Sequence, residues 1–184
     1  MGWSKALLRV TAALLLVCAA RLGAQAARAS EAQVEAVFLF NFAQFVDWPP
    51  EAVPDSQAPL VIGILGGDPF GDFLDATVRG ERRGARPFVV HRYQRVDDVT
   101  KCDILFISRS AGYAPEDILA RLKNRPILTV SDADRFAERG GMIRFVTDKS
   151  RIRLQINPEA AEAAHLTISS KLLRVAEVIT PTAR

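Results

Sequence analysis

The pattern of apolar and polar positions is clearest between residues 143 and 156, where it predicts a β-hairpin. Residues 151–156 read Arg-Ile-Arg-Leu-Gln-Ile, and residues 143–145 read Ile-Arg-Phe. An apolar residue at every second position is typical of a strand with one buried face. Asp148-Lys149-Ser150, between the two runs, has the composition of a tight turn. The two strands are therefore expected to pair in antiparallel fashion.

Two helices are expected after this hairpin. Asn157 can cap a helix whose first residue is a proline, because the first helical position does not need the N–H that proline lacks. Further along, Ile168, Leu172 and Ala176 recur every fourth residue, with Leu173 beside them, which predicts an amphipathic helix that closes the chain.

Residues 32–46 predict the first helix of the mature chain. Apolar side chains recur there at three- and four-residue spacing, namely Val34, Val37, Phe38, Phe42 and Phe45. The sequence Trp-Pro-Pro at residues 48–50 should end this helix. The aromatic residues admit two interpretations: core packing, or a docking surface for a helical partner. The aromatic residues in question are Phe38, Phe40, Phe42, Phe45 and Trp48.

Apolar runs of strand length alternate with helical segments through the middle of the chain. The expected strands are residues 60–65, 87–92, 103–107 and 126–130; the expected helices are residues 115–122 and 131–138, with another capped by Asp68. Strands buried on both faces that alternate with helices indicate a parallel sheet covered on both sides. The predicted fold is α/β: a mostly parallel sheet flanked by helices on both faces, in a Rossmann-like three-layer arrangement, with a C-terminal antiparallel hairpin and closing helices.

The first 29 residues predict a secretory signal peptide rather than part of the fold. Lys5 and Arg9 precede an apolar run over residues 10–20, and alanine-rich cleavage sites follow it. This run is shorter than the roughly 20 residues that span a membrane. Cys18 is not expected to carry a lipid, because Val17 stands where lipoprotein signals usually place a small residue. Residues 30–184 are then a single domain in the periplasm.

Removal of this segment changes the charge of the protein. The chain has 24 Lys and Arg against 21 Asp and Glu. Four of the basic residues lie in the first 29 positions and no acidic residue does, so 24 − 4 = 20 basic residues remain against 21 acidic ones. A near-neutral domain has no basis for general binding to nucleic acid or to membrane surfaces. Cys102 is then the only cysteine, so no intrachain disulfide is available, and a buried inert thiol is expected.

No arrangement of residues in the sequence is typical of a catalytic site. The only histidines are His91 and His165, and their spacing does not match that of a metal-ligand cluster. No serine stands in G-x-S-x-G. Gly66-Gly67 follows a strand, but the spacing is not G-x-G-x-x-G, so a tight turn is expected instead of a phosphate site. The sequence therefore predicts no catalytic residues, no metal and no cofactor.

Arginines of the hairpin are the candidate binding residues. A turn centred on Asp148-Lys149 would place Arg144 opposite Arg153, and like charges directly opposite destabilise a hairpin unless something neutralises them. Either the two side chains are solvated, or an anionic ligand or the carboxylates of a partner lie against them. The candidate partner or anion surface consists of Arg144, Arg151, Arg153, Phe38, Phe42, Phe45 and Trp48.

Several of these stretches resemble the YfiR-like family of periplasmic regulators. The similar stretches are residues 40–42 with Trp48-Pro49, and residues 64–71, 102–108, 140–143, 155–157 and 168–173. They follow the family order over nearly the whole mature chain. The resemblance implies a non-enzymatic protein that represses an inner-membrane diguanylate cyclase of the YfiN type, in cyclic-di-GMP signalling. The best-known member of this family is disulfide-bonded. This chain departs from it, because Cys102 is the only cysteine after cleavage, so redox control is not carried over from the resemblance.

Two hypotheses about function follow from the residues and the resemblance together. The first is a periplasmic regulator that binds and represses an inner-membrane signalling protein. The alternative is a periplasmic module that binds a small anionic ligand and feeds a sensor. Both hypotheses leave a homodimer open.

Overall fold

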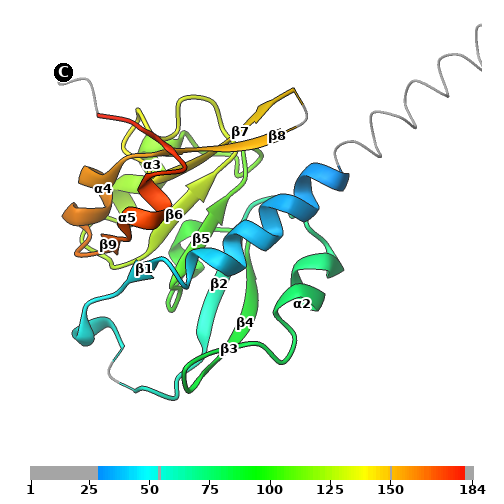
Figure 1. The fold of residues 1–184 in the computed structure, drawn as a ribbon, viewed down its shortest axis with the longest axis vertical. Helices are drawn as coiled ribbons and strands as arrows, with labels where there is room; N and C mark the ends of the chain where they lie inside the picture. The colour runs from blue at the N-terminus through cyan, green and yellow to red at the C-terminus, as the bar shows by residue number, and fades with distance from the viewer. Residues whose placement is uncertain (1–28, 54, 150, 181–184) are drawn as a thin grey trace, which may run out of the picture.

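The computed structural model describes residues 29–53, 55–149 and 151–180. Within them, one eight-stranded sheet has the order β10-β8-β7-β6-β5-β2-β4-β3, and β1 pairs with β9 in a separate two-stranded sheet (Figure 1). Five neighbouring strands are parallel: β4 (Arg86–Tyr93), β2 (Leu60–Leu65), β5 (Ile104–Ile107), β6 (Leu128–Ser131) and β7 (Ile143–Asp148). The predicted α/β fold with a mostly parallel sheet is confirmed.

The central strands are buried along their full length, which explains their continuous apolar sequences. Every residue of β2, β5 and β6 is buried. After β2 the chain adds β4 on one side and then returns to add β5, β6 and β7 on the other. The strand order therefore reverses between β2 and β5. Doubly wound sheets bind their ligands beside such a reversal, at the carboxyl ends of the strands.

The N-terminal helix (residues 29–42) covers one face of the sheet (Figure 1). Leu39 and Phe42 are fully buried, and the Phe42 ring stacks on Phe145 of β7 at 5.9 Å between ring centres. The helix ends four residues before the predicted position. Val46 and Asp47 form β1, which pairs with β9 (Thr167–Ile168), so a strand pairing from the far end of the chain stops the helix before the prolines do.

Helices and loops pack on both faces of the sheet. The N-terminal helix, α2 (Asp72–Val78), α4 (Pro158–Ala163) and α5 (Ser170–Leu173) contribute to one apolar cluster with the sheet, and α3 (Pro115–Arg121) contributes to the other. Asn157 caps α4 as predicted: its Oδ1 accepts from the backbone N–H of Ala160 (3.0 Å) and its Nδ2 donates to the Ala137 carbonyl (3.0 Å).

Three predicted helices differ from the structure. No helix forms over residues 131–138: Ser131 still belongs to β6, and residues 134–140 form turns. Asp68 accepts from the N–H groups of Phe70 and Gly71, so it caps a turn, and α2 begins only at Asp72. The closing helix is reduced to α5, because Ile168 is held in β9.

Short strands lie at both edges of the large sheet. At one edge, β10 (Glu177–Val178) pairs with the hairpin strand β8 (Arg151–Ile156). At the other edge, β3 (Arg82–Arg83) pairs with β4. The strands β3 and β10 are only two residues long, and no repeating pattern can be recognised over such a length.

The hairpin forms as predicted, but its register differs. Arg144 lies opposite Gln155, and Arg153 lies opposite Val146. The predicted pairing of Arg144 with Arg153 is therefore wrong. The ladder continues to Asp148 opposite Arg151, and Lys149 adopts a φ of 48°. The turn thus falls one residue later than expected, which moves the pairing by two residues and leaves every side chain on its expected face.

The signal peptide predicted over residues 1–29 lies almost entirely outside the described residues. Among the residues that are described, no helix has both the length and the apolar character needed to cross a membrane.

Candidate functional site

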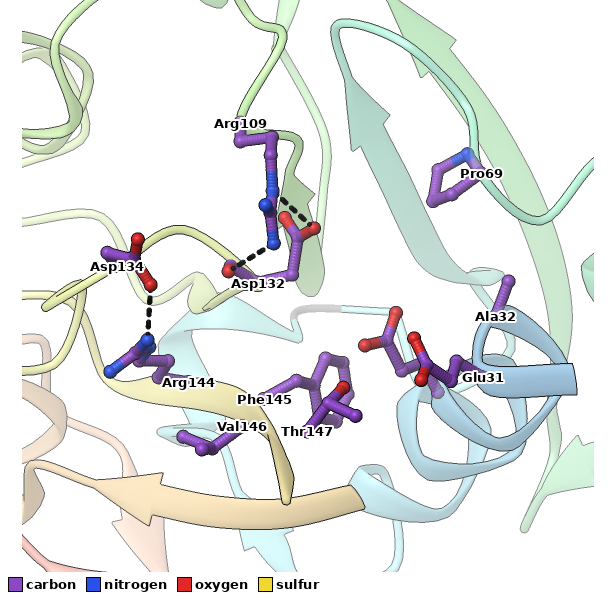
Figure 2. Close-up of a pocket in the computed structure, with 11 residues that line it drawn as sticks. Glu31, Ala32, Pro69, Arg109, Asp132, Asp134, Arg144, Phe145, Val146 and Thr147 are labelled. Atoms are coloured by element: carbon purple, nitrogen blue, oxygen red, sulfur yellow. Dashed lines mark hydrogen bonds and ion pairs between the residues drawn. The ribbon is translucent and has the colours of Figure 1, made fainter. Parts of the chain in front are cut away.

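A cleft of about 570 Å³ lies at the carboxyl ends of the parallel strands (Figure 2). We call it the carboxyl-edge cleft. Its walls come from the loops after β2, β5 and β6, from β7, which extends beyond the end of β6, and from the N-terminal helix. The lining residues are Glu31, Ala32, Glu35, Pro69, Arg109, Asp132, Asp134, Arg144, Phe145, Val146 and Thr147.

Each arginine of the cleft is bound to a carboxylate. Arg109 Nε donates to Asp132 Oδ2 (2.9 Å), and Arg144 Nη2 donates to Asp134 Oδ1 (2.6 Å). Arg144 Nη1 also donates to Gln155 Oε1 across the ladder (3.1 Å). Figure 2 shows both ion pairs on the side of the cleft opposite Glu31. Arg144 is therefore neutralised by an aspartate, so it is not the open anion site that the predicted register implied.

Glu35 is the residue that the sequence reasoning missed. It lies on the same helical stripe as the buried Ala32, Ala36 and Leu39, and only 8% of its surface is exposed. Burial, with smaller contributions from the negative charges of Asp132 and Glu31, raises the pKa of Glu35 to about 7. Glu35 is the only charged residue between positions 32 and 46. A carboxylate within the apolar stripe of a helix was the signal that could have revealed it.

Two polar atoms of the cleft residues are buried without a partner among the described residues. They are Asp132 Oδ1 and Arg144 Nε. Buried polar groups in proteins are almost always hydrogen-bonded. The charged residues of this cleft thus retain hydrogen-bonding capacity that the described part of the chain does not fill.

The aromatic residues of the predicted surface have different environments. Phe42 is fully buried and belongs to the core, so it cannot contact a partner. Phe38 and Phe45 are half-buried against the same core. Trp48 is also half-buried; the Arg83 guanidinium lies 5.3 Å from its ring centre, and its Nε1 has no partner among the described residues.

From Gln33 to Asn41, the outward side of the N-terminal helix has no charged residue. Val34 and Val37 are 43% and 41% exposed, and their exposed or half-buried neighbours on the helix are Gln33, Phe38 and Asn41. Because charged residues normally cover exposed helix faces, an uncharged face with two exposed valines is a candidate contact surface.

Arg151 and Arg153 are exposed on β8, and Arg153 pairs with Asp148 at 2.9 Å. The N-terminal helix packs on the face of the hairpin that carries Phe145. Strand alternation places Arg151 and Arg153 on the other face. The structure thus separates Arg151 and Arg153 from the helix, whereas Arg144 lines the same cleft as Glu31 and Glu35. The predicted residues therefore do not form one continuous surface.

Cys102 is a free thiol with no group nearby that would activate it. Its sulfur packs against Gly63, where an added Cβ would lie 2.7 Å from the sulfur, and burial raises the pKa of the thiol to about 12. His91 and His165 are exposed at separate places in the fold. Among the described residues, no group of three or more His, Cys, Asp or Glu side chains could hold a metal ion.

Comparison with known proteins gives one family match. A family model described as YfiR/HmsC-like matches residues 32–177. No curated protein matches the chain.

The solved structures that match this chain are distant in sequence. One is a conserved domain protein from Vibrio cholerae, at 15% identity and a TM-score of 0.47, covering 71% of this chain and 57% of that protein. Another is the ABC domain in complex with L-Trp from Streptococcus pneumonia, at 14% identity and a TM-score of 0.50, covering 80% of this chain and 60% of that protein. The chain thus spans less than two thirds of either protein, and the second likeness shows the α/β fold alone.

Proposed function

We propose a function from the premise that this chain belongs to the YfiR/HmsC-like family. The protein is a periplasmic, non-enzymatic regulator that binds an inner-membrane diguanylate cyclase and lowers its output. The observation that carries this proposal is the family match over residues 32–177, which runs from the N-terminal helix to β10 and so includes almost all of the described domain.

The mechanism we propose is a shift of population in the membrane partner. A regulator that binds the inactive arrangement of a cyclase better than the active one lowers its output without any chemical step. The contact surface is the outward side of the N-terminal helix, centred on Val34 and Val37. The centres of protein interfaces are depleted of charge, and no exposed or half-buried residue from Gln33 to Asn41 is charged. Phe38, Phe45 and Trp48 are half-buried, and Phe42 supports the helix from the core.

The experiment changes the helix surface without changing the core. Val34→Glu together with Val37→Glu should leave a folded protein, because both side chains are more than 40% exposed. Two charges in an apolar contact should weaken capture of the membrane partner at least about tenfold, or about 1.4 kcal/mol. Second-messenger output in cells should rise accordingly. Val175→Glu is the matched control, because Val175 is 75% exposed in the turn between α5 and β10.

Thermal melts of each variant separate loss of contact from loss of fold. A folded double variant with normal capture and normal repression would contradict the helix as contact surface. The exposed pair Arg151 and Arg153 is then the second surface to test, by changing both to Glu and repeating the capture. If neither double variant alters repression, the proposed function itself fails.

A second candidate function, the binding of a small molecule, is favoured by the position of the carboxyl-edge cleft. Ligand sites of doubly wound sheets lie at the carboxyl ends of the strands, and a volume of about 570 Å³ suits a small ligand. The charges of the cleft do not favour the anionic ligand that was expected from the sequence.

A further inference from the structure

The carboxyl-edge cleft has more negative than positive groups. Four carboxylates line it against two arginines, and both arginines are engaged, Arg109 by Asp132 and Arg144 by Asp134. Glu31 and Glu35 have no hydrogen-bond or ion-pair partner among the described residues. An anion entering the cleft would therefore have to compete with an aspartate for either arginine, whereas a cation would meet two unpaired carboxylates.

Glu35 is a second, independent indication of a ligand. More than nine tenths of its surface is buried, yet it lines the cleft. A buried carboxylate without a partner is costly, and a protonated one still has an O–H that needs an acceptor. A positively charged hydrogen-bond donor in the cleft would satisfy Glu35 in its ionised form.

The rest of the lining shows which kind of cation fits. The carboxylates are not grouped closely enough to surround a metal ion within the described part of the chain. Ala32, Pro69, Phe145 and Val146 add apolar wall to the same cavity. A ligand with one charged end and a short hydrocarbon body would match both parts of the lining.

We propose that the carboxyl-edge cleft binds a small organic cation, a primary amine or a guanidine on a short hydrocarbon chain, with its charged group against Glu35. Asp132 and Glu31 add attraction, and Arg109 lies across the cleft, held by Asp132.

The position of the cleft would also allow a bound ligand to change how the N-terminal helix binds the partner. Glu31, Ala32 and Glu35 form one wall of the cleft, and Val34 and Val37 lie on the outward side of the same helix. A ligand that favours one position of this helix changes the affinity of its outward side for the partner. This consequence rests on the proposed function; the cation site itself does not.

The test uses the purified protein without any partner. 1,4-Diaminobutane, n-butylamine and agmatine are titrated by calorimetry, with butyrate as an anion of the same carbon length. At about pH 8.5, where Glu35 is largely ionised, at least one amine should bind and butyrate should not. Glu35→Gln should weaken amine binding at least about tenfold. The matched control Glu162→Gln, at an exposed position on α4, should bind as the wild type does.

Lowering the pH to about 5.5 gives a further check, because Glu35 takes up its proton there while the amines keep theirs. Amine binding should weaken in the wild type, and this loss should be absent in Glu35→Gln. The charged groups that face Glu35 are Glu31 on its own helix, Asp132 after β6 and Arg109 after β5.

The proposal is overturned if no amine binds at about 10 mM, because the binding free energy is then smaller in size than about 3 kcal/mol. It is also overturned if butyrate binds better, or if Glu35→Gln binds the amines unchanged. Loss of partner capture in Glu35→Gln without any amine binding would assign the cleft to a basic side chain of the partner, and that result also overturns the small-ligand site. Because no partner is present in the titration, its failure leaves the proposed function to be decided by the Val34 and Val37 variants.

Discussion

Replacement of Glu35 by Gln is expected to stabilise the protein at alkaline pH. The Glu35 carboxyl is buried in the wall of the carboxyl-edge cleft, and its pKa rises from the ordinary 4.5 to about 7. Glutamine has nearly the same shape and cannot ionise. The substitution therefore removes the cost of a buried negative charge and leaves the packing of the N-terminal helix unchanged.

The size and sign of the effect follow from the two pKa values. Between pH 4.5 and about 7, the folded protein keeps a proton on Glu35 that the unfolded chain has lost. Stability must therefore fall as the pH rises through this window. At about 1.4 kcal/mol per pH unit, the whole window corresponds to about 3 kcal/mol. Near pH 4 the wild type and Glu35→Gln should be nearly equal in stability, and near pH 8.5 the variant should be more stable by up to about 3 kcal/mol.

Urea denaturation at a series of pH values, without added amines, measures this difference. Near pH 8.5 the variant should also melt up to about 6–12 °C higher than the wild type, at about 2–4 °C per kcal/mol. Glu162→Gln, at an exposed position on α4, is the control and should follow the wild type at every pH. A wild type that is more stable than Glu35→Gln at pH 8.5 would refute the reasoning, because Glu35 would then have a stabilising partner in its ionised form.

Three other substitutions test the packing of the core. Gly63→Ala should cost about 1–3 kcal/mol by urea denaturation, because its Cβ would lie 2.7 Å from Cys102 Sγ; an unchanged midpoint would contradict this packing. Arg86→Ala should cost about 3–5 kcal/mol, since it leaves the buried carboxylate of Asp103 without the guanidinium 2.7 Å away, and Arg86→Met with Asp103→Asn should recover part of that loss. Cys102→Ser should change stability by less than about 1 kcal/mol. A large loss on adding reductant to the wild type would instead reveal a disulfide between molecules.

Local patterns were sufficient to predict most elements of the fold. Continuous apolar runs predicted β2, β5 and β6, because a strand buried on both faces carries its signal within its own residues. The Asn157 cap was equally predictable, since its hydrogen bond to Ala160 joins residues three apart. Elements that depend on distant pairing were not predicted. The strand β1 exists only because β9 lies beside it, and the two are more than a hundred residues apart in the sequence.

The candidate site was predicted only in part. Arg144 and the aromatic helix were recognised as unusual, but the aspartate that neutralises Arg144 could not be foreseen, because residues 131–138 were expected to be a helix. The register of the hairpin depends on where the turn closes. A change of two residues keeps the apolar alternation, so the alternation cannot distinguish the two pairings.

The sequence by itself determined the buried strands of the central sheet, the capped helix after the hairpin, the order of these elements, and the family to which the chain belongs. These properties follow from short-range periodicity, turn residues and caps, which depend on neighbours along the chain. Only the tertiary structure decided that Phe42 is core, that Arg151 and Arg153 lie on the face away from the helix, and that Glu35 lies in a cleft with Asp132. Burial and electrostatic interactions depend on distance in space, and the fold brings together residues that the sequence separates by about a hundred positions.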